Sequence, residues 1–300
     1  MNNIESAFVG KTGAVRLCLV GLLTEGHILL EDAPGRGKTT LARAIARSVG
    51  LAFQRIQFTS DLLPSDVVGV SILDETTRTF EFQKGPVFAN IVLADELNRT
   101  TPRTQSSLLE CMNERQVTVD GETHLLPRPF TVIATQNPLE FEGTYPLPES
   151  QLDRFSLRLS IGPLDRRTEK DLLLGLAPGK SAQDLEAVIT RETLREHQSR
   201  VKAVQFDESL GDYVLDIIEE TRRAPELQLG ASTRAGLHLV DAAKAHAVLD
   251  ERTYVIPDDV KHLAGPVLAH RLIPKHAESA PAGVTNAVVH RILENVRVPA

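Results

Sequence analysis

The chain has 300 residues, 42% of them apolar and 24% charged, so it is long enough for one large or two modest globular domains and is neither disordered nor fibrous. Its 33 basic and 40 acidic residues give a net charge of −7, which argues against a protein dedicated to nucleic acid, because such proteins carry a basic surface. No apolar run approaches the roughly 20 residues needed to cross a bilayer, and the first residues lack the pattern of a signal peptide. We therefore expect a cytoplasmic chain with no transmembrane segment.

The cysteines and histidines do not predict a metal site. Cys18 and Cys111 each stand beside apolar residues, which is typical of buried free thiols in a reducing compartment. The histidines are scattered and form no HExxH motif or close Cys/His grouping. We expect two free thiols and no zinc ion.

The first half of the chain alternates short apolar runs with helical stretches, as βα units do. Continuous apolar runs predict strands that are buried on both faces of a parallel sheet. Three such runs are His27–Glu31, Ile91–Ala94 and Thr131–Ala134. A helix-forming segment, LARAIARSVG, follows the first run and ends at Gly50, and Thr104–Arg115 indicates a second helix.

Two turn sequences predict β-hairpins in the same half. Asp120 and Gly121 stand between two stretches of alternating polarity, which is a hairpin signal. Leu73–Phe82 carries the polar sequence DETTR between two short extended stretches, which favours a second hairpin.

The second half changes character and is helical almost throughout. Apolar residues recur at helical spacing in two sets: Leu210, Val214, Ile217 and Ile218, then Val284, Val288, Ile292 and Val296. The sequence VKAVQF, which begins at Val201, is a weak strand-like exception. We therefore predict an α/β domain over residues 1–162 and a smaller helical domain over residues 163–300, with the boundary at Gly162–Pro163.

Residues 28–40, ILLEDAPGRGKTT, combine an apolar strand, a glycine-rich turn and the start of a helix. Glycines let backbone N–H groups converge on phosphate oxygens, and the helix presents its positive end to the same anion. In such a loop Lys38 reaches the β- and γ-phosphates of ATP, and the Thr39 hydroxyl ligates Mg²⁺. The predicted nucleotide-binding residues are Asp32, Ala33, Pro34, Gly35, Arg36, Gly37, Lys38, Thr39 and Thr40.

The loop departs from the P-loop pattern at one position. GxxxxGK[ST] requires glycine at position 32, where this chain has Asp32. Taken alone, the motif is a near match, and a GKT sequence on an ordinary loop is the alternative.

Two carboxylates end the second apolar run. A buried strand that ends in Asp95 and Glu96 is costly unless these groups meet a cation or a polar cleft. Downstream of a P-loop, Asp95 is placed to hold Mg²⁺ and Glu96 to act as the general base on the attacking water. An ordinary acidic helix cap is the alternative.

The third apolar run also ends in polar residues, of which the last is Asn137. In a parallel sheet the carboxyl ends of the strands lie along one edge, so Asn137 is expected near Asp95 and the phosphate loop. There it could orient water or contact the γ-phosphate. A simple Asn-Pro turn is the alternative.

With these motifs in order, the chain resembles the MoxR-type AAA+ ATPases over nearly its whole length. The resemblance rests on LLEDAPGRGKTTLARAIA, FTSDLLPSDVVG, FQKGPVFANIVLADELNRTTPRTQSSLLECMNERQVTVDG, FTVIATQNPLEFEGTYPLPESQLDRF and LGASTRAG. It implies an α/β P-loop NTPase core, with a parallel sheet flanked by helices, followed by a smaller all-helical lid. It also implies that Lys38 and Thr39 belong to Walker A, that Asp95 and Glu96 belong to Walker B, and that Asn137 is sensor 1.

The resemblance gives roles to two arginines. Arg154, in PESQLDRF, matches the arginine finger that reaches the ATP of a neighbouring subunit, with Arg158 as the nearby alternative. Arg234, in GASTRAG, matches sensor 2 on the lid. Ser232 is a plausible N-cap, which would put Arg234 in the first turn of a helix. A surface salt bridge is the alternative for each arginine.

The resemblance further implies ATP and Mg²⁺ as cofactors and a hexameric ring, because a finger acting in trans needs a neighbour. It favours a chaperone-like remodeller that matures or activates a protein complex, with a von Willebrand factor A-domain protein as a separate partner and no nucleic acid. The alternatives are a nucleic-acid-dependent AAA+ motor and a nucleotide-gated regulatory binding module.

Overall fold

The computed structural model describes residues 1–33, 35–137, 143–176, 179–275 and 283–299. Contacts divide the chain into two compact units, each described here by itself. The core unit comprises Met1–Leu19, Glu25–Leu147 and Leu159–Leu194, and the lid unit comprises Val20–Thr24, Pro148–Arg158 and Arg195–Ala300. The chain thus passes between the units more than once, and a single boundary at Gly162–Pro163 stays a prediction.

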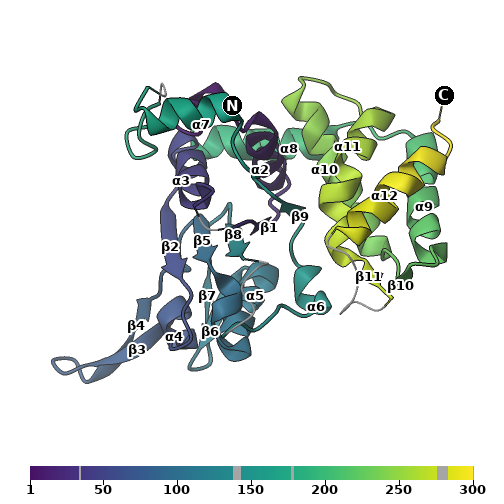
Figure 1. Cartoon of the computed structure of the whole chain (residues 1–300). Helices are drawn as coiled ribbons and strands as arrows, with labels where there is room; N and C mark the ends of the chain where they lie inside the picture. Colours follow the sequence, from purple (N-terminus) through teal and green to yellow (C-terminus); the bar gives the residue numbers. More distant parts are fainter. Residues whose placement is uncertain (34, 138–142, 177–178, 276–282, 300) are drawn as a thin grey trace. The chain divides into compact units, whose positions relative to one another are not determined.

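A five-stranded sheet forms the centre of the α/β fold (Figure 1), in the order β2-β5-β8-β1-β9. The pairs β2/β5, β5/β8 and β8/β1 are parallel, as the apolar runs predict. The strands are β1 (Ile28–Glu31), β2 (Phe53–Gln57), β5 (Ile91–Asp95), β8 (Thr131–Gln136) and β9 (Leu157–Leu159). Every residue of β5 and β8 except the last is buried, which explains the continuous apolar runs.

Helices complete the core unit. α3 (Lys38–Ser48) packs against β2 and β5 through a face that includes Leu41 and Ile45. α5 (Pro102–Glu114) begins at its N-cap Thr101, whose hydroxyl accepts from the Thr104 N–H, and the structure confirms this predicted helix. The remaining helices of the unit, wholly or in part, are α1 (Asn2–Glu5), α2 (Thr12–Leu23), α4 (Pro64–Val68), η1 (Leu97–Arg99) and α7 (Arg166–Leu173).

Both predicted hairpins are present in the core unit. β3 (Gly69–Asp74) pairs with β4 (Thr79–Lys84), and β6 (Gln116–Val119) pairs with β7 (Glu122–Leu125). The Phe82 ring stacks on the His124 ring, with centroids 4.1 Å apart and 16° between the planes. The two hairpins therefore contact each other through an aromatic pair.

The lid unit is helical, as predicted (Figure 1). Its helices, wholly or in part, are α6 (Glu149–Leu152), α8 (Arg191–Ala203), α9 (Glu208–Arg223), α10 (Thr233–Leu249), α11 (Pro257–Leu268), η2 (Ala269–Arg271) and α12 (Val284–Asn295). Two short strands, β10 (Leu227–Leu229) and β11 (Ile273–Pro274), pair in an antiparallel manner.

The predicted strand at Val201 is wrong, because this residue belongs to α8. Leu194, Gln198 and Val201 are buried at helical spacing, a period that the short window VKAVQF does not reveal. Only Gln205 keeps strand-like pairing, in an isolated bridge to Tyr254.

A charged cluster links α10 to α11 within the lid unit. Asp259 accepts hydrogen bonds from Arg252 at 2.6 and 2.7 Å and contacts His246 Nδ1 at 2.7 Å. Burial alone would raise the pKa of Asp259, but the hydrogen bonds from His246 and Arg252 lower that pKa below its usual range. Asp250 completes a group with metal-ligand spacing, yet Arg252 already supplies the compensating positive charge. The cluster is therefore a structural ion-pair network.

Cys18 and Cys111 are free and buried, as predicted. Burial raises the pKa of each thiol to about 12, so both stay protonated at neutral pH. Within the described part of the chain, no helix has the length and the apolar character needed to cross a membrane.

Candidate nucleotide site

The phosphate loop connects β1 to α3. Gly35 and Gly37 have φ values of 78° and 80°, a left-handed conformation that favours glycine. No side chain caps α3, which begins at Lys38, so its first N–H groups remain open to an anion. Of the predicted loop residues, Pro34 lies outside the described residues. The geometry of the rest suits a phosphate group.

Asp32 anchors the start of this loop. Its carboxylate accepts hydrogen bonds from the Ser160 hydroxyl at 2.9 Å and from the backbone N–H groups of Ile161 and Gly162. Its backbone carbonyl accepts from Lys38 Nζ at 2.6 Å. The aspartate that replaces the consensus glycine thus ties the loop to a segment near residue 160, a contact that no sequence motif predicts.

A cavity of about 490 Å³ opens beside the phosphate loop within the core unit. Gly35, Arg36, Gly37 and Thr40 line one part of it, and apolar side chains such as Phe8, Ile161, Leu164 and Leu172 line another. An apolar hollow next to an anion cradle fits the base and sugar of a nucleotide. Sequence patterns missed these apolar residues, because they lie far from the motif along the chain.

The acidic pair stands at the carboxyl end of β5, on the same edge as the phosphate loop, because β1, β5 and β8 run parallel. Asp95 Oδ1 accepts from the Thr135 hydroxyl at 2.7 Å, and Asp95 Oδ2 accepts from Arg55 at 2.6 Å. The side chain of Asp95 is only 14% exposed, and these two contacts fix its orientation.

Glu96 is held in an unusual backbone conformation. Its φ and ψ values are 58° and 48°, a left-handed geometry that costs about 1–3 kcal/mol for a residue with a side chain. Its carboxylate accepts from Gln57 Nε2 at 2.9 Å and from Arg99 at 3.1 Å. Its N–H donates to the Thr135 hydroxyl at 2.9 Å. Glu96 is the N-cap of η1, but its side chain makes no capping hydrogen bond.

Asn137 follows β8 directly and is buried. β8 lies between β5 and β1, with Ala134 opposite Ala94 and Gln136 opposite Glu31. This register brings Asn137 to the edge that carries the acidic pair and the phosphate loop, as predicted.

The three candidate arginines belong to the lid unit. Ser232 caps α10, since its hydroxyl accepts from the Ala235 N–H at 3.2 Å, and Arg234 is in the first turn as predicted. The Arg234 side chain is 60% exposed and lies 3.9 Å from Asp153 Oδ2. Arg154 follows the short helix α6, and Arg158 lies in β9; both are partly exposed.

Two protein families match the two parts of the chain. The family described as "ATPase family associated with various cellular activities (AAA)" matches residues 27–157, and the family described as "AAA lid domain" matches residues 219–292. Chaperone MoxR1 of Mycobacterium tuberculosis is 40% identical over 99% of this chain and 80% of its own length. Protein MoxR of Methylorubrum extorquens is 30% identical over 99% of this chain and 93% of its own length.

The chain belongs to the MoxR family of AAA+ ATPases. A solved structure of a Cytophaga hutchinsonii protein assigned as an ATPase matches this MoxR-family chain with a TM-score of 0.90 and 38% identity, over all of this chain and 93% of that one. YeaC of Bacillus subtilis, an uncharacterized protein, is 49% identical over the whole chain. The predicted fold and ATPase activity are therefore confirmed.

Two residues that sequence reasoning missed contact the acidic pair. Arg55 and Gln57 lie on β2 and contact Asp95 and Glu96, respectively. The only available signal was the alternation in FQRIQ, where Ile56 is buried and its neighbours are exposed.

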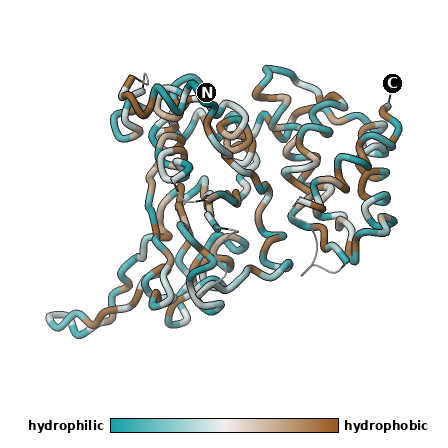
Figure 2. The backbone as a smooth tube through the Cα atoms, in the orientation of Figure 1, coloured by the Kyte–Doolittle hydropathy of each residue, from teal (hydrophilic) through white to brown (hydrophobic). Residues whose placement is uncertain are grey.

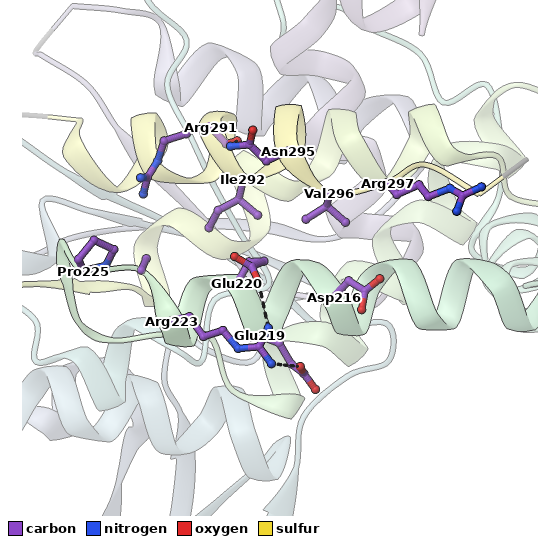
Figure 3. A pocket seen from close by; sticks show the side chains of 11 residues that line it. Asp216, Glu219, Glu220, Arg223, Pro225, Arg291, Ile292, Asn295, Val296 and Arg297 are labelled. Atoms are coloured by element: carbon purple, nitrogen blue, oxygen red, sulfur yellow. Dashed lines mark hydrogen bonds and ion pairs between the residues drawn. The ribbon is translucent and has the colours of Figure 1, made fainter.

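The lid of this MoxR-family chain contains a second hollow, of about 460 Å³, between α9 and α12 (Figure 3). Arg223 forms ion pairs with Glu219 and Glu220, and Arg291 pairs with Glu226. Since carboxylates offset these two arginines, the hollow does not concentrate positive charge and is a poor phosphate site.

Proposed function

We propose that this chain couples Mg²⁺-dependent ATP hydrolysis, in a ring of its own copies, to the remodelling of a protein client. The observation that carries the proposal is the fixed pair Asp95 and Glu96 on the same sheet edge as an open phosphate loop. The name of the mycobacterial relative, a chaperone, supports the remodelling role.

The residues of the site fit Mg²⁺ and ATP. The Thr39 hydroxyl and the Asp95 carboxylate are hard oxygen donors of the kind that Mg²⁺ prefers. Thr39 lies in the first turn of α3, and Asp95 is the last residue of β5. When bound, Mg²⁺ would neutralise charge on the β- and γ-phosphates. Lys38 would add positive charge there, with the loop N–H groups holding the phosphates in place.

The remaining roles follow from position. Glu96 would accept a proton from the attacking water, since Gln57 and Arg99 orient its carboxylate without filling all of its acceptor sites. Asn137 would orient that water as sensor 1, and Arg234 would contact phosphate as sensor 2. Arg154 would act as the finger on the ATP of the next copy in a hexamer.

The Arg154→Ala variant should not hydrolyse ATP by itself, and it should regain part of the activity when mixed with Lys38→Ala subunits. An arginine finger contributes about 10³- to 10⁵-fold to the rate. Lys38→Ala subunits should not hydrolyse ATP but should still supply a finger, so mixing them with Arg154→Ala subunits should restore activity to about a tenth or more of wild type. The measurement is ATP turnover against protein concentration for each variant and the mixture.

A mixture that stays inactive, although both variants assemble with wild type, would contradict a finger in trans at Arg154. If instead Arg158→Ala is inactive alone and regains ATP turnover when mixed with Lys38→Ala, Arg158 is the finger. Turnover that is absent, or that depends on neither protein concentration nor Arg154, would instead favour the nucleotide-gated module.

A groove of about 810 Å³ between the two hairpins is the proposed client surface. Val70 and Phe80 line it and are 46% and 73% exposed, which is a large apolar exposure for a hairpin. The hairpin of β3 and β4 carries brown, hydrophobic stretches beside teal ones (Figure 2). Asp120 and Glu122 also line it, and no lysine or arginine does so among the described residues. We assign it to an extended client segment that carries an apolar side chain beside lysine or arginine. The acidic lining also disfavours nucleic acid as the client.

Phe80→Ser should weaken the binding of a fluorescent peptide of alternating Lys and Leu by about tenfold or more, because it removes exposed apolar area from the groove. Leu173→Ser is the matched control, since Leu173 is 83% exposed on α7, away from the hairpins. A Glu/Leu peptide of equal length should bind far more weakly. If Phe80→Ser and the wild type bind the peptide with equal affinity in anisotropy titrations, the assignment is wrong. If Phe80→Ser instead fails to assemble with other copies, the groove is an interface between copies.

A further inference from the structure

The most deeply buried guanidinium group of the described lid belongs to Arg271, in η2, whose side chain is 3% exposed. Its Nε donates to Asp153 Oδ1 at 2.8 Å, and its Nη2 donates to the Phe155 carbonyl at 2.6 Å. Longer contacts reach the carbonyls of Asp153 and Ser156, and one further bond goes to the Val267 carbonyl within the lid helices. One guanidinium thus joins α11 to the segment 153–156.

The adjacent residue strengthens the same attachment. His270 is buried, and its Nε2 lies 3.0 Å from the Phe155 carbonyl. Burial lowers the pKa of His270 well below its usual value, so the ring is neutral. Because a carbonyl oxygen only accepts, Nε2 carries the proton and donates it. Phe155 is therefore held by two consecutive lid residues.

The segment 153–156 connects α6 to β9. Three backbone bonds continue the turn of α6 into it, from the N–H groups of Asp153, Arg154 and Phe155 to the carbonyls of Glu149, Gln151 and Leu152, respectively. Arg154 lies between the two residues that Arg271 contacts most closely. Arg271 therefore holds the backbone on both sides of Arg154.

Burying a guanidinium carries a desolvation penalty, and an apolar side chain would fill the same volume without it. The planar fork of arginine is the one side chain that can reach a carboxylate and several carbonyls in fixed directions. A lysine has a single nitrogen and cannot make these contacts together. The arrangement therefore favours a positioning role over simple packing.

We infer that Arg271 is a positioning residue that fixes the segment carrying Arg154, so that the Arg154 guanidinium is presented in one orientation. The inference rests on the proposed role of Arg154 as a finger in trans. Asp153 also connects Arg271 to Arg234, the proposed sensor 2. Its Oδ1 accepts a hydrogen bond from Arg271, and its Oδ2 lies 3.9 Å from Arg234. A change in the position of Arg234 would therefore reach the Arg154 segment through Asp153.

Arg271→Lys and Arg271→Met should each lower kcat about 10- to 100-fold, the effect of misplacing a catalytic group by about 1 Å, while KM for ATP changes less than twofold. The methionine variant should fold, because Asp153 is 31% exposed and keeps its hydration. Arg291→Lys is the matched control, since Arg291 pairs with Glu226 and is 46% exposed. Arg291 lies on α12 (Figure 3), and its replacement should leave kcat at the wild-type value.

Mixed rings distinguish a displaced finger from general damage. Lys38→Ala subunits carry an intact finger, so mixing them with Arg271→Lys or Arg271→Met subunits should restore turnover as far as mixing them with Arg154→Ala subunits does. If the mixture restores turnover to Arg154→Ala but not to the Arg271 variants, the inference about Arg271 is wrong, while the finger in trans still stands. No rescue of Arg154→Ala would overturn the finger in trans and the inference with it. Unchanged kcat in both Arg271 variants would also overturn the inference.

Discussion

Glu96→Gln is expected to bind ATP with an affinity within about twofold of wild type and to lose hydrolysis by about 10²- to 10⁴-fold, the usual contribution of a general base. Glutamine keeps an oxygen that can accept from Gln57 and Arg99, so the local structure should survive. Only the ability to take a proton from water is removed. Titration with a fluorescent ATP analogue, together with steady-state phosphate release, measures both properties.

Glu114→Gln is the control for this change, because Glu114 is exposed at the end of α5 and its replacement removes the same single negative charge. It should leave turnover at the wild-type rate. Retention of more than about a tenth of the activity in Glu96→Gln would exclude Glu96 as the base. A loss of ATP binding would instead show that Glu96 shapes the site.

Asp32→Gly would restore the consensus of the phosphate loop and should nevertheless destabilise the protein by about 3 kcal/mol or more. The buried carboxylate accepts three hydrogen bonds, from Ser160, Ile161 and Gly162, and bonds to a charged acceptor contribute about 1.5–3 kcal/mol each. A unit of this size should then melt about 6 to 12 °C lower. Thermal unfolding with and without ATP measures the effect.

Asp184→Asn provides the control, because Asp184 is exposed in the same unit and its replacement should move the melting temperature by about 1 °C or less. Asp32→Asn should resemble Asp32→Gly, since its amide would face N–H donors that need an acceptor. A melting temperature of Asp32→Gly equal to that of wild type would contradict the anchoring role.

The sequence predicted the parts of the fold that local patterns encode. The strands β1, β5 and β8 are buried on both faces and therefore appear as unbroken apolar runs, and Asp120-Gly121 marks its turn through backbone preference alone. The order of motifs then placed the phosphate loop, the acidic pair and Asn137 at one edge, because parallel strands share their carboxyl ends.

Contacts between distant segments could not be predicted in this way. The partners of Asp32 lie about 130 residues further along the chain, and those of Arg271 lie about 116 residues before it. Gln57 meets Glu96 only because β2 pairs with β5. In each case the partners of a polar residue are set by tertiary structure, which one sequence does not reveal.

The inertness of the two native thiols makes the protein a convenient subject for spectroscopy. Cys18 and Cys111 are buried with pKa values of about 12, so neither presents a reactive thiolate to a maleimide dye at neutral pH. New cysteines at exposed positions such as Leu173 in α7 and Leu237 in α10 would then take the label without removal of the native ones. A dye pair at these two sites would follow the distance between core and lid through each cycle of ATP turnover.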